Sequence, residues 1–294
     1  MNTPPFVSVR LVTYNHEKWI AQCLESILMQ RTDFPFEVIV GEDCSTDGTL
    51  DIVLAYAERH PDKIHVLPAE ANLGAMTNSY RVQQACRGKY HAMIEGDDYW
   101  IDPLKLQKQV DLMEANPDMT LCFHNVFVMN ADNLNASLYY TDAVPDTLTF
   151  ADTSRIRTPV VSHMARSDVL ASQPAWRLKI WCGDVLFRLW CAHHGTVGYL
   201  NEVMAVYRWH ANGVTARTIA QPEKRFSDII YLYQQLDRDT GYSHSDVLQE
   251  QIKKEQEAWR RQQLGWRYYL LRPGAFVARL KQYIQAVARY KNSY

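Results

Sequence analysis

The sequence has 294 residues, which is enough for one large domain or for one domain with an appended segment. Hydrophobic residues make up 47% and charged residues 22%, so the composition excludes a disordered or fibrous chain. The net charge is only -2, but residues 253–294 contain ten Lys and Arg residues against Glu255 and Glu257, a local charge of +8. This asymmetry favours a basic segment that meets an anionic surface, with a solvated basic helix as the alternative.

The cysteines and the apolar runs indicate the cellular compartment. Six cysteines are scattered without a C-x-x-C pair, and the first residues lack the basic and apolar layout of a signal peptide. No apolar run approaches the roughly 18 residues of a membrane span. We therefore expect buried, reduced thiols and a cytoplasmic protein, either soluble or peripheral at the inner face of the plasma membrane.

The first part of the chain alternates strand-like and helical patterns. Buried strands are predicted at 6–13, 36–41, 64–67 and 90–94. Helical periodicity is found near 17–30, 47–60, 74–87 and 103–115. This alternation predicts an α/β fold with a mainly parallel sheet flanked by helices, in which ligands bind at the carboxyl ends of the strands.

The second part of the chain is less regular. A strand is predicted near 119–129, a helix at 183–194 and a strand at 197–207. The segment 130–157 is polar and weakly periodic, so we interpret it as a long and potentially mobile connection. Beyond residue 221 the pattern is almost entirely helical, with an interruption at 272–274. We divide the chain into a domain of residues 1–218, with halves 1–129 and 130–218, and a basic helical region of residues 219–294.

Polar motifs follow the first two predicted strands. The first strand ends in Val12, Thr13, Tyr14 and Asn15, and the second leads into Asp43. A tyrosine ring can stack on a nucleotide base, and a carboxylate can accept a hydrogen bond from a base N–H group. Helix capping and simple packing are the competing interpretations of these polar residues.

A third motif follows the fourth strand. Glu95, Asp97 and Asp98 place three carboxylates within four positions, and these charges repel one another unless a proton or a cation neutralises them. Oxygen ligands of this kind suit a hard divalent metal ion, Mn²⁺ or Mg²⁺, which can bridge the phosphates of a nucleotide. The alternative is an acidic helix start ahead of Pro103.

Taken in order, these motifs resemble the family 2 glycosyltransferases of the GT-A fold. The resemblance rests on Thr13-Tyr14-Asn15, on the stretch 40–49 and on Glu95-Gly96-Asp97-Asp98. It covers about residues 5–215. It departs from the common family pattern at Glu42, Cys44 and Glu95, which stand where Asp, Gly and Asp are usual.

The resemblance implies a role for each motif. Val12, Thr13, Tyr14 and Asn15 would bind the nucleotide together with Asp43 and Asp97, with uracil as the preferred base. The metal ligands would come from Glu95, Asp97 and Asp98, and which of the three binds the metal stays open.

Two further segments extend the resemblance into the second half. Asp184 opens a predicted helix and matches the family's catalytic base, which takes the proton of the acceptor hydroxyl in an inverting displacement. A helix-cap carboxylate is the competing interpretation. The segment 207–214 matches a family stretch near the diphosphate, in which His210 would complete the metal site or contact phosphate and Arg208 would contact phosphate.

These observations predict an inverting glycosyltransferase, a hexosyl- or hexosaminyltransferase, that uses a nucleotide diphosphate sugar. Segment 259–294 interleaves basic with aromatic and aliphatic residues, which favours peripheral membrane contact and a lipid-linked or surface-polysaccharide acceptor. Nucleic acid is not expected, because the rest of the chain is acidic. The alternatives are an inactive nucleotide-sugar-binding or scaffold protein of the same fold and a sugar nucleotidyltransferase.

Overall fold

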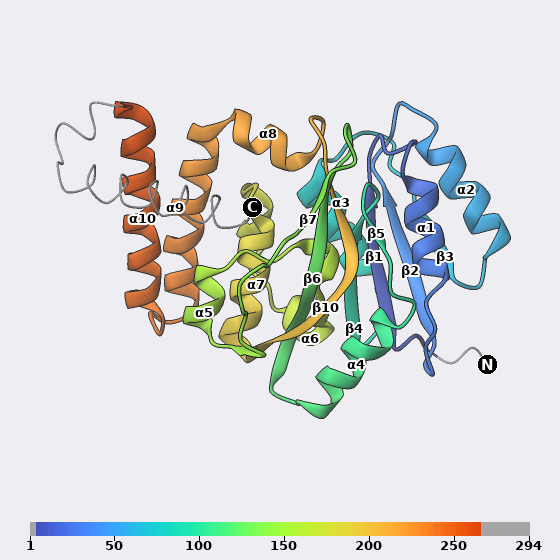
Figure 1. Cartoon of the computed structure of the whole chain (residues 1–294), viewed down its shortest axis with the longest axis horizontal. Helices are drawn as coiled ribbons and strands as arrows, with labels where there is room; N and C mark the ends of the chain where they lie inside the picture. Colours follow the sequence, from blue (N-terminus) through green and yellow to red (C-terminus); the bar gives the residue numbers. More distant parts are fainter. Residues whose placement is uncertain (1–3, 266–294) are drawn as a thin grey trace, which may run out of the picture.

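The structure of the chain, a computed structural model, describes residues 4–265. The predicted interruption at 272–274 and most of the basic segment 259–294 lie outside these residues. In the described range, the strands form one mixed sheet with helices on both faces, and two further helices stand at one end (Figure 1).

The sheet has the strand order β3-β2-β1-β4-β9-β6-β10-β5, with β7 beside β6 and β8 beside β10. The strand bounds are β1 Val7–Thr13, β2 Phe36–Glu42, β3 Ile64–Leu67, β4 Tyr90–Glu95, β5 Tyr99–Trp100, β6 Met119–Asn130, β7 Ala136–Leu138, β8 Thr147–Leu148, β9 Met164–Arg166 and β10 Thr196–Trp209. The long pairs β1–β2, β1–β4, β2–β3 and β6–β10 are parallel, as predicted. The three-residue strand β9 runs antiparallel to both β4 and β6 and joins the two parallel blocks.

The register of the first block brings its strand ends together. Thr13 lies opposite Glu42 on β2, and Val12 lies opposite Glu95 on β4. The residues that follow these strands therefore meet at one edge of the sheet, which is the edge where parallel sheets bind ligands.

Helices cover both faces of the sheet. Their bounds are α1 Ile20–Leu28, α2 Thr49–Arg59, α3 Ala75–Ala85, α4 Lys105–Ala115, α5 Phe150–Arg155, α6 Ser167–Ala171, α7 Gly183–His194, α8 Val214–Ala220, α9 Pro222–Asp239 and α10 Ser245–Leu264, with short 3₁₀ turns at Val160–Ser162 and Ala175–Lys179.

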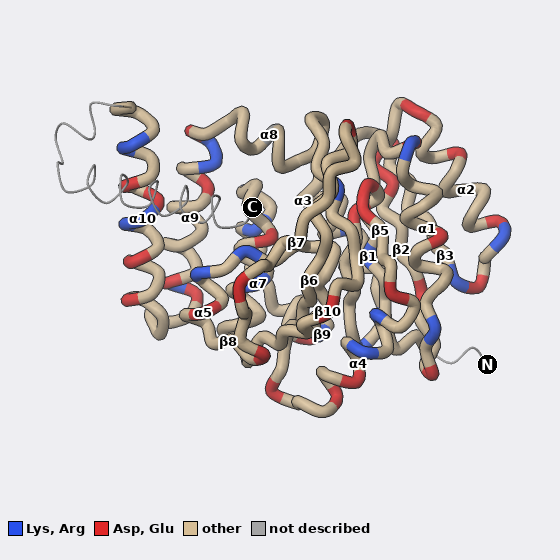
Figure 2. The backbone as a smooth tube through the Cα atoms, in the orientation of Figure 1, with Lys and Arg blue, Asp and Glu red and all other residues tan. Residues whose placement is uncertain are grey.

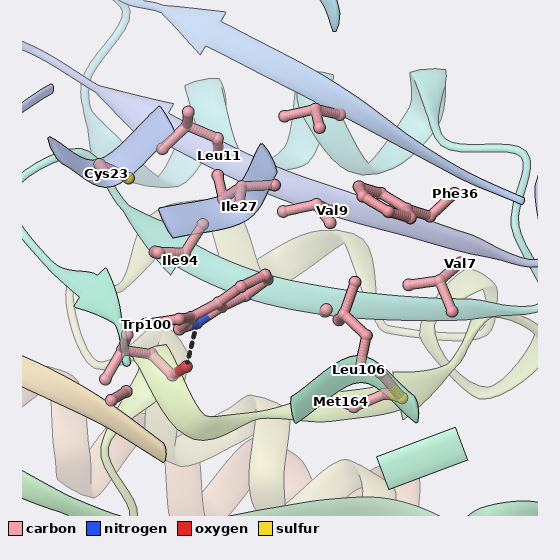
Figure 3. Close-up of a cluster of buried hydrophobic side chains, with 14 of the residues drawn as sticks. Val7, Val9, Leu11, Cys23, Ile27, Phe36, Ile94, Trp100, Leu106 and Met164 are labelled. Carbon is pink, nitrogen blue, oxygen red and sulfur yellow. Dashed lines mark hydrogen bonds between the residues drawn. The ribbon is translucent and has the colours of Figure 1, made fainter. Parts of the chain in front are cut away.

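An apolar core lies on each face of the sheet. The first core packs α1, α2 and α4 on one face of the strands, and its buried members include Val9, Leu11 and Ile27 (Figure 3). Trp100 closes this core and donates its indole N–H to the carbonyl of Val161 over 3.1 Å. The second core lies on the other face and joins α5, α6 and α7 to α9 and α10. Strand β6 serves both cores, because alternate residues of a strand point to opposite faces.

The segment 130–157 differs from the prediction of a long structureless connection. It contains β7, which pairs with the distal part of β6, then β8 and α5. Helix α5 begins with a capping box in which Thr149 and Asp152 satisfy each other's backbone N–H groups. The prediction failed because strands of two and three residues are too short to show periodicity.

The cysteines and the C-terminal helices agree with the sequence. All six cysteines are free thiols, with Cys23, Cys122 and Cys191 buried. The predicted C-terminal helices are present as α9 and α10, and these carry both signs of charge (Figure 2). Arg225 of α9 and Glu255 of α10 form an ion pair of 3.4 Å. Over residues 4–265, no helix is long and apolar enough to cross a membrane.

Candidate active site and metal centre

A cavity of about 160 Å³ opens where β1, β2, β4 and β10 end. Eight of the residues that the sequence singled out line it: Val12, Thr13, Tyr14, Asp43, Glu95, Asp97, Arg208 and His210. Asn15, Asp98 and Asp184 are not on its wall. The wall also contains residues to which the sequence assigned no individual role, among them His16, Asn72, Asn78, Tyr207 and Thr215.

Asp43 lines the cavity and is almost fully buried. Its two carboxylate oxygens accept hydrogen bonds from the backbone N–H groups of Leu73 (2.8 Å) and Gly74 (3.0 Å). Asn72 donates its side-chain amide to the carbonyl of Asp43. The carboxylate therefore fixes the loop before α3 as well as facing the cavity, and each of its oxygens keeps a lone pair for a further donor.

The turn after β2 explains two departures from the common family pattern. Cys44 has a φ of 59°, a left-handed conformation that favours glycine. The buried carboxylate of Glu42 accepts the backbone N–H groups of Cys44 (3.1 Å) and Ser45 (2.9 Å). Glu42 thus holds the turn that a glycine would adopt more easily, which is a structural role outside the cavity.

Asn15 holds two loops together. Its backbone φ is 56°, its N–H group donates to Ser45, and its side-chain oxygen accepts the N–H group of Thr46 over 2.8 Å. Asn15 is exposed and does not line the cavity, and its contacts tie the ends of β1 and β2 to each other.

Asp97 is the centre of the acidic motif. One of its oxygens, Oδ2, lies 2.9 Å from Nε2 of His210 and 3.7 Å from Nε2 of His16. Burial alone raises the pKa of Asp97, but the His210 hydrogen bond and the nearby histidines outweigh it and lower that pKa below its usual value. Its other oxygen, Oδ1, is buried and has no hydrogen-bond partner among the described residues.

The pKa values of the neighbouring carboxylates Glu95 and Asp98 are raised, whereas that of Asp97 is lowered. Burial, followed by the charges of Asp97 and Asp184, raises the pKa of Glu95 to about 8. Burial also raises the pKa of Asp98 well above its usual value. Asp98 accepts the backbone N–H of Arg208 at 2.8 Å, while its second oxygen is buried without a partner in the part of the chain that the structure describes.

The donor set fits a divalent cation. Two groups can bring three ligand atoms within 4.8 Å of one another, namely Glu95 with Asp97 and Asp98, and His16 with Asp97 and His210. Both groups share Asp97. Buried carboxylate oxygens without partners are costly, and a bound cation would satisfy them.

The guanidinium of Arg208 interacts with other groups of the protein. Its guanidinium donates to the carbonyl of Asp97 and to the side chain of Gln22, and it lies 4.4 Å over the ring of Tyr99. These contacts draw the side chain toward α1 and β5, and they lock the end of β10 against the acidic motif.

Asp184 stands in the first turn of α7 and is exposed to solvent. Its charge contributes, after burial and the charge of Asp97, to the raised pKa of Glu95. The neighbouring Gly183 approaches Met76 of α3, so α7 begins at the edge of the sheet that carries the cavity.

The missed residues carried weak signals. His16 directly follows the Thr13-Tyr14-Asn15 motif, and Asn72 directly precedes the Leu73-Gly74 turn, so both occupy loops at the binding edge. Tyr207 and Thr215 are joined by a hydroxyl hydrogen bond of 2.8 Å. That contact depends on how the chain turns after β10, which a sequence pattern does not specify.

The family model described as "Glycosyl transferase family 2" matches residues 8–165, more than half of the chain. An uncharacterized Mycobacterium tuberculosis protein, Rv1520, is 35% identical over 217 residues, and the match covers 71% of this chain but 60% of that protein. This chain thus spans less than two thirds of the length of its mycobacterial relatives. A Bacillus subtilis protein named "Putative teichuronic acid biosynthesis glycosyltransferase TuaG" is 27% identical over 81% of this chain and 90% of its own length.

Solved structures show the same fold. The structure of TarS from S. aureus in complex with UDP-GlcNAc matches with a TM-score of 0.69 at 20% identity, over 90% of this chain and 75% of that one. The mannosyltransferase PcManGT from Pyrobaculum calidifontis, in complex with GDP-Man and Mn²⁺, matches with a TM-score of 0.61 at 19% identity, over 98% of this chain and 84% of that one. The predicted fold class, a GT-A sheet flanked by helices with a helical C-terminal extension, is confirmed.

Proposed function

Because the chain belongs to glycosyl transferase family 2, we propose that it transfers a sugar from a nucleoside diphosphate donor, a UDP-sugar, to an acceptor hydroxyl. The observation that carries this proposal is the cavity in which Tyr14, Asp43, Asp97 and His210 converge from separate strand ends. We assign donor binding to residues 1–129 and the completion of catalysis to residues 130–218.

The nucleotide would lie against the ends of β1 and β2. Tyr14 offers a half-buried ring for stacking, and Asp43 offers a carboxylate that its loop contacts hold in one orientation. Val12 and Thr13 complete the wall beside them. Asn15 supports this wall by holding the ends of β1 and β2 together.

The diphosphate would lie beside the acidic motif. A divalent ion, Mn²⁺ or Mg²⁺, would neutralise the charge that develops on the leaving diphosphate. Asp97, Asp98, Glu95 and His210 are the residues that we assign to hold it. The partnerless oxygens of Asp97 and Asp98 support this assignment. The contacts of Arg208 support a positioning role for that residue, with phosphate contact only after its present partners are released.

Asp184 is the residue that we assign as general base. Its exposed carboxylate can accept the proton of an acceptor hydroxyl that attacks the anomeric carbon from the face opposite the diphosphate. A single displacement of this kind inverts the anomeric configuration. The approach of the neighbouring Gly183 to Met76, which directly follows the cavity-lining Gly74 and Ala75, supports the placement of Asp184 beside the reacting centre.

The acceptor is proposed on chemical grounds. The +8 charge of residues 253–294 supports contact with an anionic membrane surface at the inner face of the plasma membrane, and hence a lipid-linked or surface-polysaccharide acceptor. TuaG is named for teichuronic acid biosynthesis, which supports a polysaccharide acceptor. TarS was solved with UDP-GlcNAc, which supports a hexosaminyl or hexosyl donor.

Calorimetric titration of UDP and GDP, with and without Mn²⁺ or Mg²⁺, tests the proposal. We expect UDP to bind more tightly when the metal is present, and Asp97→Asn to abolish that gain. Asp111→Asn is the matched control, because Asp111 is an exposed carboxylate on α4. Metal-independent binding would contradict the metal site. Binding of a UDP-sugar with no release of UDP, by hydrolysis or by transfer, in a coupled assay would identify an inactive binding protein instead.

A further inference from the structure

We propose that His16 is a further metal ligand, so that two imidazole nitrogens, from His16 and His210, hold the ion together with carboxylate oxygen. The inference rests on the proposed function, because it concerns the ion that would accompany the nucleotide. It assigns a metal-binding role to the loop after β1, and it narrows the class of ion to those that accept nitrogen ligands.

The geometry around Asp97 carries the inference. Nε2 of His210 and Nε2 of His16 lie 2.9 Å and 3.7 Å from the same oxygen, Oδ2 of Asp97. Adjacent ligands on one ion lie about 3 Å apart when the bonds are about 2.1 Å long, and opposite ligands lie about 4.2 Å apart. Both distances fall in or near this range, and the three ligand atoms lie within 4.8 Å of one another. An ion would therefore need only a small adjustment of the side chains.

The rest of the imidazole of His16 is fixed as metal-binding histidines usually are. Its Nδ1 lies 3.2 Å from Oγ1 of Thr13, and donation from Nδ1–H leaves the lone pair of Nε2 facing Asp97. Ligating histidines commonly donate their other ring N–H in this way, which fixes the tautomer. The backbone N–H of His16 also donates to Oγ1 of Thr49 over 2.8 Å, which anchors the loop.

Gly96 makes room for this arrangement. A Cβ atom at residue 96 would lie 2.5 Å from Oγ1 of Thr13 and 2.8 Å from Nδ1 of His16. The ring of Trp19 packs 4.4 Å from the ring of His210 and 6.0 Å from that of His16, so a single aromatic side chain flanks both imidazoles. The loops after β1, β4 and β10, which are far apart in the sequence, thus meet here, and both histidines lie beside one carboxylate.

The donor set predicts which ions bind. Imidazole suits transition metals, whereas Mg²⁺ prefers oxygen ligands and water. We therefore expect affinity to rise from Mg²⁺ through Mn²⁺ to Co²⁺, in the order that nitrogen donors impose.

The direct test counts nitrogen ligands. Mn²⁺ is added to the full chain, and electron spin echo modulation measures its coupling to imidazole nitrogen, with ¹⁵N-histidine labelling to verify the source. We expect two coupled nitrogens in the wild type and one in His16→Asn. Asn keeps a polar group near the position of Nδ1 and removes the one at Nε2. His60→Asn, at the far end of α2, should keep two.

Affinity provides a second measurement. His16→Asn should weaken Mn²⁺ binding by about 10- to 100-fold with little change for Mg²⁺. His16→Gln places an oxygen near the position of Nε2, and should recover part of the affinity while reducing the preference for Mn²⁺ over Mg²⁺. A single coupled nitrogen in the wild type, unchanged in His16→Asn, would overturn the inference and leave the proposed function intact. A wild type that binds no Mn²⁺ would overturn the inference, and one that binds neither Mn²⁺ nor Mg²⁺ would also contradict the proposed metal site.

Discussion

The two halves of the sheet build the site in different ways. The β1–β4 half supplies Tyr14, Asp43 and Asp97 from residues that directly follow strands, and the parallel register brings those strand ends together. The half built on β6, α7 and β10 supplies Asp184 from a helix start and His210 from the end of a 14-residue strand. The proposed nucleotide binding therefore depends mainly on local motifs, whereas the proposed catalytic base and the histidine ligand depend on long-range packing.

Substitution of the proposed base should have the largest effect, and it tests whether binding and chemistry are divided between the two halves. Asp184→Asn should lower kcat by about 10²- to 10⁴-fold, because an amide cannot accept the acceptor's proton. The Kd for UDP should not change, since Asp184 is not on the cavity wall. Both quantities are measurable on the same preparation. Asp168→Asn is the matched control, because Asp168 is also an exposed acid in the first turn of a helix of this half. A rise in the Kd for UDP would break the division.

A buried lysine on α4, between the halves, predicts a dependence of stability on pH. Lys105 is fully buried, and its Nζ donates to Gln109 over 2.6 Å and lies 4.2 Å from the ring of Trp100. Burial lowers the pKa of Lys105 to about 7. Between that pH and the ordinary lysine pKa, the unfolded chain binds the proton and the native chain does not. The free energy of unfolding should therefore rise with pH, by at most about 1.4 kcal/mol per pH unit from this group.

The comparison of Lys105→Met with the wild type isolates this contribution. Urea unfolding from pH 6.5 to 9.5 should show the wild type gaining stability relative to the variant as the pH rises. Lys253→Met should give a curve parallel to the wild type, because Lys253 is exposed on α10. A parallel curve for Lys105→Met as well would contradict a neutral buried lysine.

A smaller effect on stability should come from substituting Gly96, which lies close to Thr13 and His16. Gly96→Ala places a Cβ atom against Thr13 and His16, so we expect a loss of about 1–3 kcal/mol in the free energy of unfolding and weaker UDP binding. The double variant with Thr13→Ala should recover part of the stability, because the nearest contact is then gone. Additive losses in chemical denaturation would show that the strain lies elsewhere.

The smallest effect is expected at the turn after β2. Cys44→Gly should raise the free energy of unfolding by up to about 1 kcal/mol, because glycine adopts the left-handed conformation without the cost that a side chain incurs. The kcat of the proposed sugar transfer should not change. A destabilised variant would show that Cys44 packs usefully where the structure leaves it half-buried.

The sequence predicts most of the first half, because long strands and helices show their periodicity. Helix α7 has the predicted bounds, and β3 does too. Strands β5, β7, β8 and β9 were missed, because two or three residues carry no period and their pairing is set by distant segments. Similarly, the motifs located Asp43 and Asp97, but nothing local indicated that Arg208 hydrogen-bonds to Gln22, near the start of the chain, and to the carbonyl of Asp97.

Strand β9 has a consequence for how the chain tolerates change in length. Because β9 is antiparallel to β4, it ends beside Tyr90, at the edge of the sheet remote from the cavity. The chain must then return along the height of β4, roughly 20 Å for six residues, before α7 can present Asp184. The segment between α6 and α7 must therefore have a minimum length. We expect it to tolerate insertions, whereas a large deletion would move the proposed base away from the sugar.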